Sequence, residues 1–276
     1  MICFNADAFL EPVLESILPF GKVIVTEGPV GYWQSKGFTT STDKTNEILQ
    51  KYIPVENRLH GTWAEKNDMM QAAESLIPKD TTHVWMVDAD EIYTAETIQL
   101  IAHSLDDYDS VSFIPYTCYG GFERYLTGFE QEFEWIRIQR WRPDAHWYTH
   151  RPPTVLDERG RPYRSRRHLV SREHFFHYSY VLPKQVQSKI EYYTSWGAGV
   201  IPHYFERVYL KWMHARTGHE RQQIEREFHG VHEWLPQRRT DCFTAQYMGR
   251  HPHVIRERIS KYTTRMQIEL ATLFDV

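Results

Sequence analysis

The chain has 276 residues, of which 41% are hydrophobic and 25% are charged, a balance typical of a folded globular protein rather than a disordered one. Its formal net charge of -4 argues against a nucleic-acid binder that is held by attraction to phosphates. The 3 cysteines, Cys3, Cys118 and Cys242, are scattered and form no C-x-x-C pair. We therefore expect free thiols in a reducing compartment, not a disulfide framework or a zinc site.

The start of the chain shows no targeting signal. Asp7, Glu11 and Glu15 lie among its apolar residues and no basic region precedes them, so a signal peptide is not expected. No apolar run approaches the roughly 18–20 residues that would span a bilayer. We expect a cytoplasmic protein without a transmembrane segment.

The N-terminal part alternates short apolar runs with helical periodicity. Asn5 and Asp7 are typical N-cap residues, so we expect them to begin the first helix. The predicted elements are a strand at 1–4, a helix over about 9–18, a strand at 22–26, a loop at 28–40, and helices over about 41–52 and 63–77. This alternation is typical of a mostly parallel sheet with crossover helices.

The apolar run at 84–87 ends abruptly in Asp88, Asp90 and Glu91. Open α/β sheets bind ligands beyond the carboxyl ends of their strands, where such acids would lie. Carboxylates this close repel one another unless a cation neutralises them, and hard oxygen ligands suit Mg²⁺ or Mn²⁺. The pattern alone leaves open a simpler interpretation, in which the acids cap the next helix.

The rest of the chain is less regular. We expect a helix to about 105, strands at 111–114 and 133–141, long loops rich in Pro, Arg and His at 142–172, and helices from about 184, the clearest at 255–273. These patterns suggest an α/β domain at 1–190 and a helical C-terminal extension at 191–276 that packs on it.

Several separated motifs together resemble one family. They are Phe4-Asn5-Ala6-Asp7, Ile24-Val25-Thr26-Glu27-Gly28 with Ser41-Thr42-Asp43-Lys44-Thr45, Trp63-Ala64-Glu65-Lys66-Asn67, Asp88-Ala89-Asp90-Glu91, and His177-Tyr178-Ser179-Tyr180. In this order and spacing they resemble the metal-dependent, GT-A type glycosyltransferases, especially the family 2 group. The match departs from the family in the Ala-Asp after Asn5 and in the insertion around Trp33.

The resemblance implies a GT-A, Rossmann-like fold of mostly parallel sheet with crossover helices. It implies an enzyme that uses Mn²⁺ or Mg²⁺ to move a sugar from a nucleoside-diphosphate sugar to a glycan or other hydroxylated acceptor, with a mild preference for inversion. A sugar nucleotidyltransferase is one alternative, although residues 1–20 contain no glycine-rich phosphate loop. A catalytically inactive carbohydrate-binding relative is the other.

The same resemblance assigns roles to individual residues. Asp90 would bind the metal directly, Asp88 would bind the ribose or a metal-bound water, and His177 would be a third metal ligand, with His174 as its rival. Glu91 is expected to cap the following helix. The expected nucleotide-sugar contacts are Glu27, Asp43, Lys66, Asp88, Lys184 and Lys189. One or two members of the basic run Arg159, Arg161, Arg164, Arg166, Arg167 and Arg172 would add charge for the pyrophosphate.

The catalytic base stays open at this point, because residues 147–153 contain no acid where relatives often carry one. The candidates are Asp144, His150, Asp157 and Glu158, and a retaining mechanism without such a base is an alternative. Five aromatic residues could stack on an acceptor sugar or equally well pack in the core: Trp135, Trp141, Trp147, Tyr148 and Tyr163.

Overall fold

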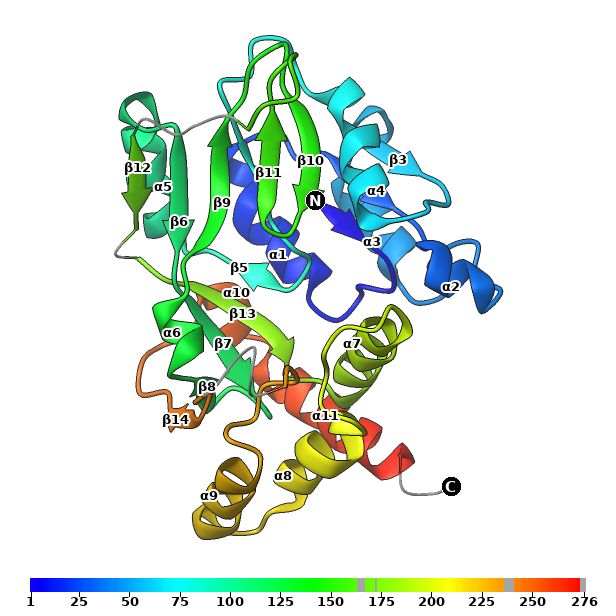
Figure 1. Cartoon of the computed structure of the whole chain (residues 1–276), viewed down its shortest axis with the longest axis vertical. Helices are drawn as coiled ribbons and strands as arrows, with labels where there is room; N and C mark the ends of the chain where they lie inside the picture. The colour runs from blue at the N-terminus through cyan, green and yellow to red at the C-terminus, as the bar shows by residue number, and fades with distance from the viewer. Residues whose placement is uncertain (163–166, 172, 236–240, 274–276) are drawn as a thin grey trace. The chain divides into compact units, whose positions relative to one another are not determined.

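The computed structural model describes every residue except 163–166, 172, 236–240 and 274–276 (Figure 1). The chain forms two compact units, which we describe separately. The N-terminal unit comprises Met1–Ile114 and Glu134–Phe175, and the C-terminal unit comprises Pro115–Phe133 and Phe176–Val276. These units differ from the two expected domains, and the boundary near residue 190 remains a prediction. The architecture is mixed α/β, with several small sheets instead of one continuous sheet.

A parallel sheet begins the N-terminal unit, coloured blue to cyan in Figure 1. Its strands lie in the order β1 (Ile2–Cys3), β2 (Val25–Glu27) and β3 (Arg58–His60). Helices α1 (Leu10–Ile17) and α3 (Thr45–Tyr52) contribute apolar side chains to the core beside it. The first two strands and both helices confirm the sequence prediction. Strand β3 was missed, because its short, partly exposed run carries no apolar signal.

Two local predictions in this region are wrong. The N-cap position of α1 is Phe9, without a side-chain cap. The side chain of Asn5 instead accepts the N–H of Thr42, and the backbone N–H of Asp7 donates to Asp43. Residues 28–40 are not purely a loop, since they contain the short helix α2 (Gly31–Ser35). Trp33 of this helix lies 5.8 Å from the ring of Phe4, so the apolar insertion covers the end of β1.

A second sheet holds β12 (His168–Val170), β6 (Ser110–Phe113), β9 (Trp135–Arg140) and β4 (His83–Trp85), in that order. Only β12 and β6 run parallel, and the other neighbours are antiparallel. The prediction of a mostly parallel sheet therefore holds for β1–β3 but not here. After β4 the chain continues beside β9, where the Met86 N–H donates to the Arg137 carbonyl at 2.8 Å. It then forms β5 (Glu91–Ile92) and the predicted helix α5 (Ala95–Ser104).

The segment expected to be long loops instead contains a hairpin of β10 (His146–His150) and β11 (Pro153–Leu156). The hairpin forms because Trp147 and Val155 alternate inward and are buried with Met70 and Met86. Helix α4 (Lys66–Ala73) packs against β10, and the side-chain amide of Gln71 donates to the Trp147 carbonyl at 2.9 Å. The hairpin is thus part of the folded core.

In the C-terminal unit the strands β14 (Thr244–Gln246), β8 (Arg124–Leu126), β7 (Pro115–Tyr119) and β13 (Phe175–Tyr180) are neighbours in that order. The helices are α6 (Phe129–Glu132), α7 (Pro183–Ser195), α8 (Lys211–His214), α9 (Gly218–Glu227), α10 (His253–Arg256) and α11 (Ile259–Thr272), with a π-helical turn at Phe205–Leu210. The predicted helical character beyond residue 184 is confirmed, apart from β14.

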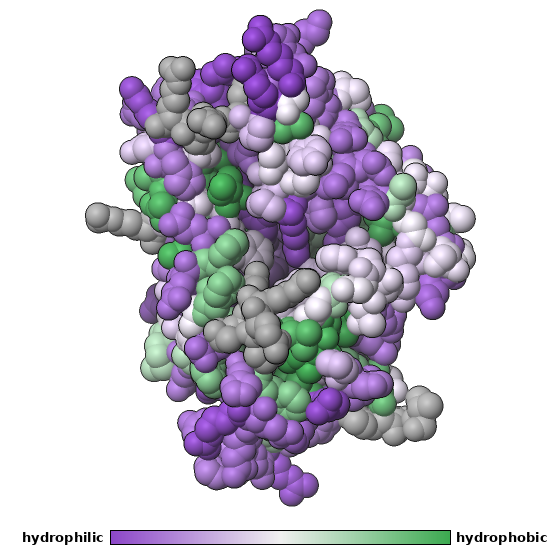
Figure 2. All heavy atoms as spheres, in the orientation of Figure 1, coloured by the Kyte–Doolittle hydropathy of each residue, from purple (hydrophilic) through white to green (hydrophobic). Residues whose placement is uncertain are grey.

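Among the described residues, no helix is both long and apolar enough to cross a membrane. Figure 2 shows hydrophilic side chains over most of the visible face, with hydrophobic ones gathered in smaller groups.

Candidate functional site

Two loops that follow the parallel strands β1 and β2 are joined by hydrogen bonds. Both loops were singled out in the sequence as separate motifs. The backbone N–H groups of one loop donate to side chains of the other and vice versa. The contacts are Asn5 N–H to Ser41 Oγ (2.9 Å), Ala6 N–H to Thr45 Oγ1 (2.7 Å), Asp7 N–H to Asp43 Oδ2 (3.0 Å) and Thr42 N–H to Asn5 Oδ1 (2.8 Å). They fix a polar edge at the carboxyl ends of two strands.

Glu27 and Asp43 hold this edge together. Buried Glu27 accepts hydrogen bonds from the backbone N–H and the hydroxyl of Ser41, and its other oxygen lies 2.5 Å from Nδ1 of His60. Asp43 accepts from Asp7 and, through its other oxygen, from the N–H of Thr45 at 2.9 Å. Both carboxylates therefore position the loops, and a direct nucleotide contact by either remains a prediction.

The Asp88–Asp90 segment belongs to the same unit and lies beside β1. Ala89, between the two acids, packs against the apolar cluster that contains Cys3 of β1. Ile2 packs against the neighbouring cluster, which contains Met86. The structure thus brings the first and the fourth of the sequence motifs together, although they are far apart in the chain.

Asp88 lies among basic side chains. Its Oδ2 is 3.2 Å from Nη2 of Arg137 and 3.5 Å from Nη2 of Arg151. Burial alone would raise its pKa, but the positive charges of Arg137, Arg151 and Lys66 hold the pKa well below its usual range. Asp88 is therefore ionised at neutral pH. Both guanidinium contacts fall on Oδ2, and Oδ1 takes part in neither.

Glu91 does not cap α5, which corrects the sequence prediction. Thr94 is the cap, and its hydroxyl accepts the Thr97 N–H at 3.1 Å. Fully buried Glu91 instead forms an ion pair with Arg137, which is itself 3% exposed. Burial raises the pKa of Glu91, Asp88 adds to that rise and Arg137 opposes it. Arg137 is a site residue that the sequence reasoning missed, although an arginine between Ile136 and Ile138 in a strand is an available signal.

The oxygen donors present suit a hard divalent cation. Asp88 and Asp90 offer carboxylates, which Mg²⁺ and Mn²⁺ prefer. Within the described part of the chain, no group of three or more His, Cys, Asp or Glu side chains is arranged to hold a metal ion. A site of the Asp88–Asp90 type would need ligands from the substrate or water, as Mg²⁺ commonly does. Direct ligation by Asp90 remains a prediction.

His150 and Lys66 both lie close enough to Asp88 for their charges to act on it. Lys66 is the first residue of α4, next to the capping box formed by Glu65 and Asp68. His150, at the end of β10, has its backbone N–H and its Nδ1 both 3.0 Å from Oδ1 of Asn67. The pKa of His150 is lowered to about 3, first by burial and then by the charges of Lys66 and Arg151. His150 is therefore neutral at physiological pH.

The other candidate bases have ordinary turn positions. Asp157 accepts hydrogen bonds from Arg161 and from the Arg159 N–H, which lower its pKa. Glu158 is exposed and lies 3.9 Å from Arg159. Asp144 lies in the turn between β9 and β10. The hydrogen bonds to Asp157 thus make it a weaker base, and a catalytic role for Asp144 or Glu158 remains a prediction.

His177 belongs to the C-terminal unit, unlike the carboxylates it was predicted to join. It is buried on β13, with Nδ1 3.3 Å from Oγ1 of Thr117, whose hydroxyl donates to Glu130 at 2.7 Å. Nδ1 of His174, the alternative candidate, lies 2.9 Å from the carbonyl oxygen of Ile114. Metal ligation by His177 remains a prediction.

Lys189 lies in a buried polar cluster of the C-terminal unit. Its Nζ donates to Ser179 at 2.9 Å, lies 3.5 Å from Glu233 Oε1 and is 3.7 Å from the centroid of the Tyr180 ring. His232 contacts the other oxygen of Glu233 at 3.0 Å. Sequence reasoning missed this cluster, because its acid and histidine lie in a stretch interpreted only as helical. The Lys189 ammonium thus has partners within the protein, and its contact with a phosphate remains a prediction.

The remaining predicted contacts are mostly at the surface. Lys184 has an exposed side chain, and its backbone N–H donates to Glu269 at 2.9 Å. Arg159, Arg161 and Arg167 are exposed. Arg164, Arg166, Arg172 and Tyr163 lie outside the described residues.

The aromatic residues divide between core and surface. Trp141 and Trp147 are buried and lie 5.7 Å apart, centroid to centroid, so the core interpretation holds for both. Tyr148 is 58% exposed. Trp135 is half-buried, with its ring beneath the Arg137 guanidinium at 4.8 Å. Among the predicted acceptor aromatics that the structure describes, Tyr148 is thus the most exposed.

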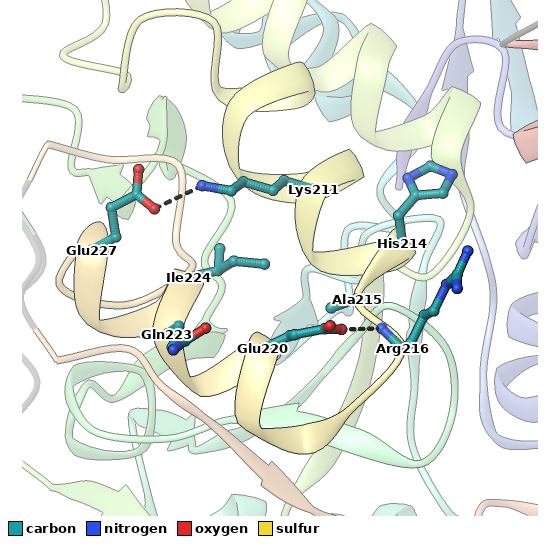
Figure 3. A pocket seen from close by; sticks show the side chains of 8 residues that line it. All are labelled: Lys211, His214, Ala215, Arg216, Glu220, Gln223, Ile224 and Glu227. Carbon is teal, nitrogen blue, oxygen red and sulfur yellow. Dashed lines mark hydrogen bonds and ion pairs between the residues drawn. The ribbon is translucent and has the colours of Figure 1, made fainter.

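A hollow of about 410 Å³ lies between α8 and α9 in the C-terminal unit (Figure 3). Lys211 and Glu227 form an ion pair across it at 2.7 Å (Figure 3). Glu220 accepts the Arg216 N–H at 2.6 Å. Its lining contains none of the predicted site residues.

No known protein-family model matches this chain, and no curated protein matches it either. The function must therefore be argued from the site itself.

Proposed function

We propose that this chain is a GT-A type glycosyltransferase that moves a sugar from a nucleoside-diphosphate sugar to a hydroxyl of a glycan or similar acceptor. The observation that supports it most is the setting of Asp88, an ionised carboxylate beside β1 with Arg137 and Arg151 in contact and Lys66 nearby. A diphosphate with a divalent cation presents both signs of charge. The site offers carboxylates to the cation and basic groups to the phosphates.

The joined loops after β1 and β2 supply the second half of the argument. Ligands of open α/β sheets bind outside the carboxyl ends of the strands. Here that edge carries Asn5, Ser41 and Asp43, held in place by the contacts described above. We assign the nucleoside to this edge and the diphosphate to the Asp88 side.

A bound Mn²⁺ or Mg²⁺ would offset phosphate charge and stabilise the leaving nucleoside diphosphate. Asp90 and Asp88 are the residues that would hold it. Lys66 and Arg151 would bind phosphate oxygens from the protein side. We favour inversion of configuration at the anomeric carbon.

A screen of nucleotide sugars tests the proposal. The purified chain is mixed with UDP-, GDP- and dTDP-sugars with and without Mn²⁺, and binding is measured by calorimetry and turnover by release of nucleoside diphosphate. Asp90→Asn should abolish the metal-dependent part of binding. Asp80→Asn is the matched control, because Asp80 is an exposed acid in the turn before β4.

Two outcomes would replace the proposal. Formation of pyrophosphate from a nucleoside triphosphate and a sugar phosphate would indicate a nucleotidyltransferase. Binding of glycans with no binding or turnover of any nucleotide sugar would indicate a carbohydrate-binding protein. Undiminished metal-dependent nucleotide binding by Asp90→Asn would remove the assigned metal site.

A further inference from the structure

Asn67 and His150 come from α4 and β10, 83 residues apart, and meet through two contacts. The His150 backbone N–H and ring Nδ1 are each 3.0 Å from the side-chain oxygen of Asn67. A backbone N–H can only donate, so the Asn67 atom that faces it must be the amide oxygen and not the amide nitrogen. That oxygen only accepts, so Nδ1 must carry the ring proton. The lone pair of the neutral ring is therefore on Nε2.

We propose that Asn67 is a positioning residue that holds His150 in the Nδ1–H tautomer, and that Nε2 of His150 accepts the proton of the acceptor hydroxyl. This inference rests on the proposed function. An imidazole oriented through its other nitrogen is a common arrangement for a general base. Residues 147–153 contain no acid that could serve as the base, and His150 of this segment would take that role.

The step balances as a single displacement. The acceptor O–H bond breaks and an Nε2–H bond forms on His150. The acceptor oxygen bonds to the anomeric carbon of the donor sugar. The bond from that carbon to the phosphate oxygen breaks, and its electron pair leaves with the nucleoside diphosphate. The imidazolium then returns its proton to water.

In the ligand-free protein, burial and the nearby positive charges keep the His150 ring unprotonated but also make it a weak base. Burial disfavours protonation of the ring most, Lys66, Arg151 and Arg137 add to this effect, and Asp88 opposes it. The ring therefore keeps its lone pair at neutral pH. A bound diphosphate would offset the charges of Lys66 and Arg151 and so raise the basicity of Nε2 when the donor is in place.

The tautomer is tested by nitrogen NMR of the ligand-free protein. The ¹⁵N shifts of the His150 ring should show a protonated Nδ1 and a bare Nε2. Asn67→Leu should lose this pattern. Asn46→Leu is the matched control, since Asn46 is another helical asparagine, whose side chain donates to Thr40 at 2.9 Å. A wild-type ring with its proton on Nε2 would overturn the inference.

The proton-acceptor role is tested by transfer. His150→Gln should lower nucleoside-diphosphate release in the presence of acceptor by about 10²–10⁴-fold while donor binding by calorimetry is kept. Asn67→Leu should lower kcat with little change in the KM for the donor. If His150→Gln transferred sugar at the wild-type rate, His150 would not be the proton acceptor. If the wild-type protein turned over none of the sugar nucleotides tested, both the proposed function and the base role of His150 would be wrong. The NMR result on the Nδ1–H tautomer would still be valid, because it does not depend on turnover.

Discussion

Arg137 Nη2 lies 3.2 Å from Asp88 Oδ2, and the same guanidinium also pairs with Glu91 in the interior of the N-terminal unit. The carboxylate of Asp88 is thus partly neutralised by the protein itself. From the sequence alone, we expected the acids of this segment to repel one another unless a bound cation neutralised them. A divalent ion at this site would add to an existing balance of charge.

Removing Arg137 should therefore lower the free energy of unfolding. Arg137→Met leaves buried Glu91 without its partner, and because burial raises the pKa of Glu91 to about 8, this acid can take up a proton in the variant. We therefore expect a loss of about 1–3 kcal/mol, the cost of an unsatisfied buried polar group. Urea denaturation measures this loss in the free energy of unfolding. The double variant Arg137→Met with Glu91→Met should regain much of it, and Arg159→Met, at an exposed position, should cost less than about 1 kcal/mol. Equal losses in the single and double variants would contradict the pairing.

Trp147 and Tyr148 are neighbours with opposite expected effects. Trp147→Ala should destabilise the protein by about 3–5 kcal/mol, because the ring is buried against Trp141 in the core. Tyr148→Ala removes an exposed ring and should change stability by less than about 0.5 kcal/mol. If Tyr148 meets the acceptor, its variant should instead raise the KM for acceptor. Thermal unfolding and transfer kinetics on the same samples separate the two effects.

Lys189 is expected to matter for stability through the buried Glu233. Lys189→Met removes the ammonium 3.5 Å from Glu233 and over the ring of Tyr180. Glu233 then keeps its contacts with His232 and with the hydroxyl of Tyr180. We therefore expect a loss of about 2–4 kcal/mol, below the full cost of an unpaired buried charge. Lys184→Met is the control, because that side chain is exposed. A loss of nucleotide binding without a loss of stability would restore the phosphate role predicted from the sequence.

The sequence predicted elements best where apolar periodicity was strong. The helix carrying Leu10, Val13 and Leu14 and the strand before Glu27 lie within a few residues of their predicted positions, because burial of those side chains decides the local structure. Strand β3 and the hairpin at 146–156 were missed. Their pairing depends on distant partners, β2 for one and helix α4 for the other, which no local pattern reveals.

The site was predictable in its acids but not in their partners. Asp88 could be found from a run of apolar residues that ends in carboxylates. Arg137 carries a local signal, its place between two isoleucines of a strand, but its partner does not. The partners of Arg137 and Asn67 lie 49 and 83 residues away in the sequence, so no local pattern reveals them. For the same reason the role of Asn5 was wrong: its side chain favours a nearby helix cap, yet the structure uses it to bind the N–H of Thr42.

Acid should weaken the native state through His150. Its pKa is lowered from 6.5 to about 3 on folding, so between these values the unfolded chain binds more protons than the native one. Stability therefore falls as pH drops below about 6.5, by about 1.4 kcal/mol per pH unit at most. At pH 5 the contribution lost is at most about 2 kcal/mol relative to pH 7, by that same slope. Above pH 7 this group has no effect, because the ring is neutral in both states.

His150→Gln isolates this contribution from those of the other histidines. Urea denaturation of wild type and variant at pH 7 and pH 5 gives the difference directly. The variant should lose less stability than wild type on acidification, and His103→Gln, at an exposed position on α5, should lose as much as wild type. Equal losses in wild type and His150→Gln would show that the ring protonates freely in the native state. The charges of Lys66 and Arg151 would then not act on it as the structure indicates.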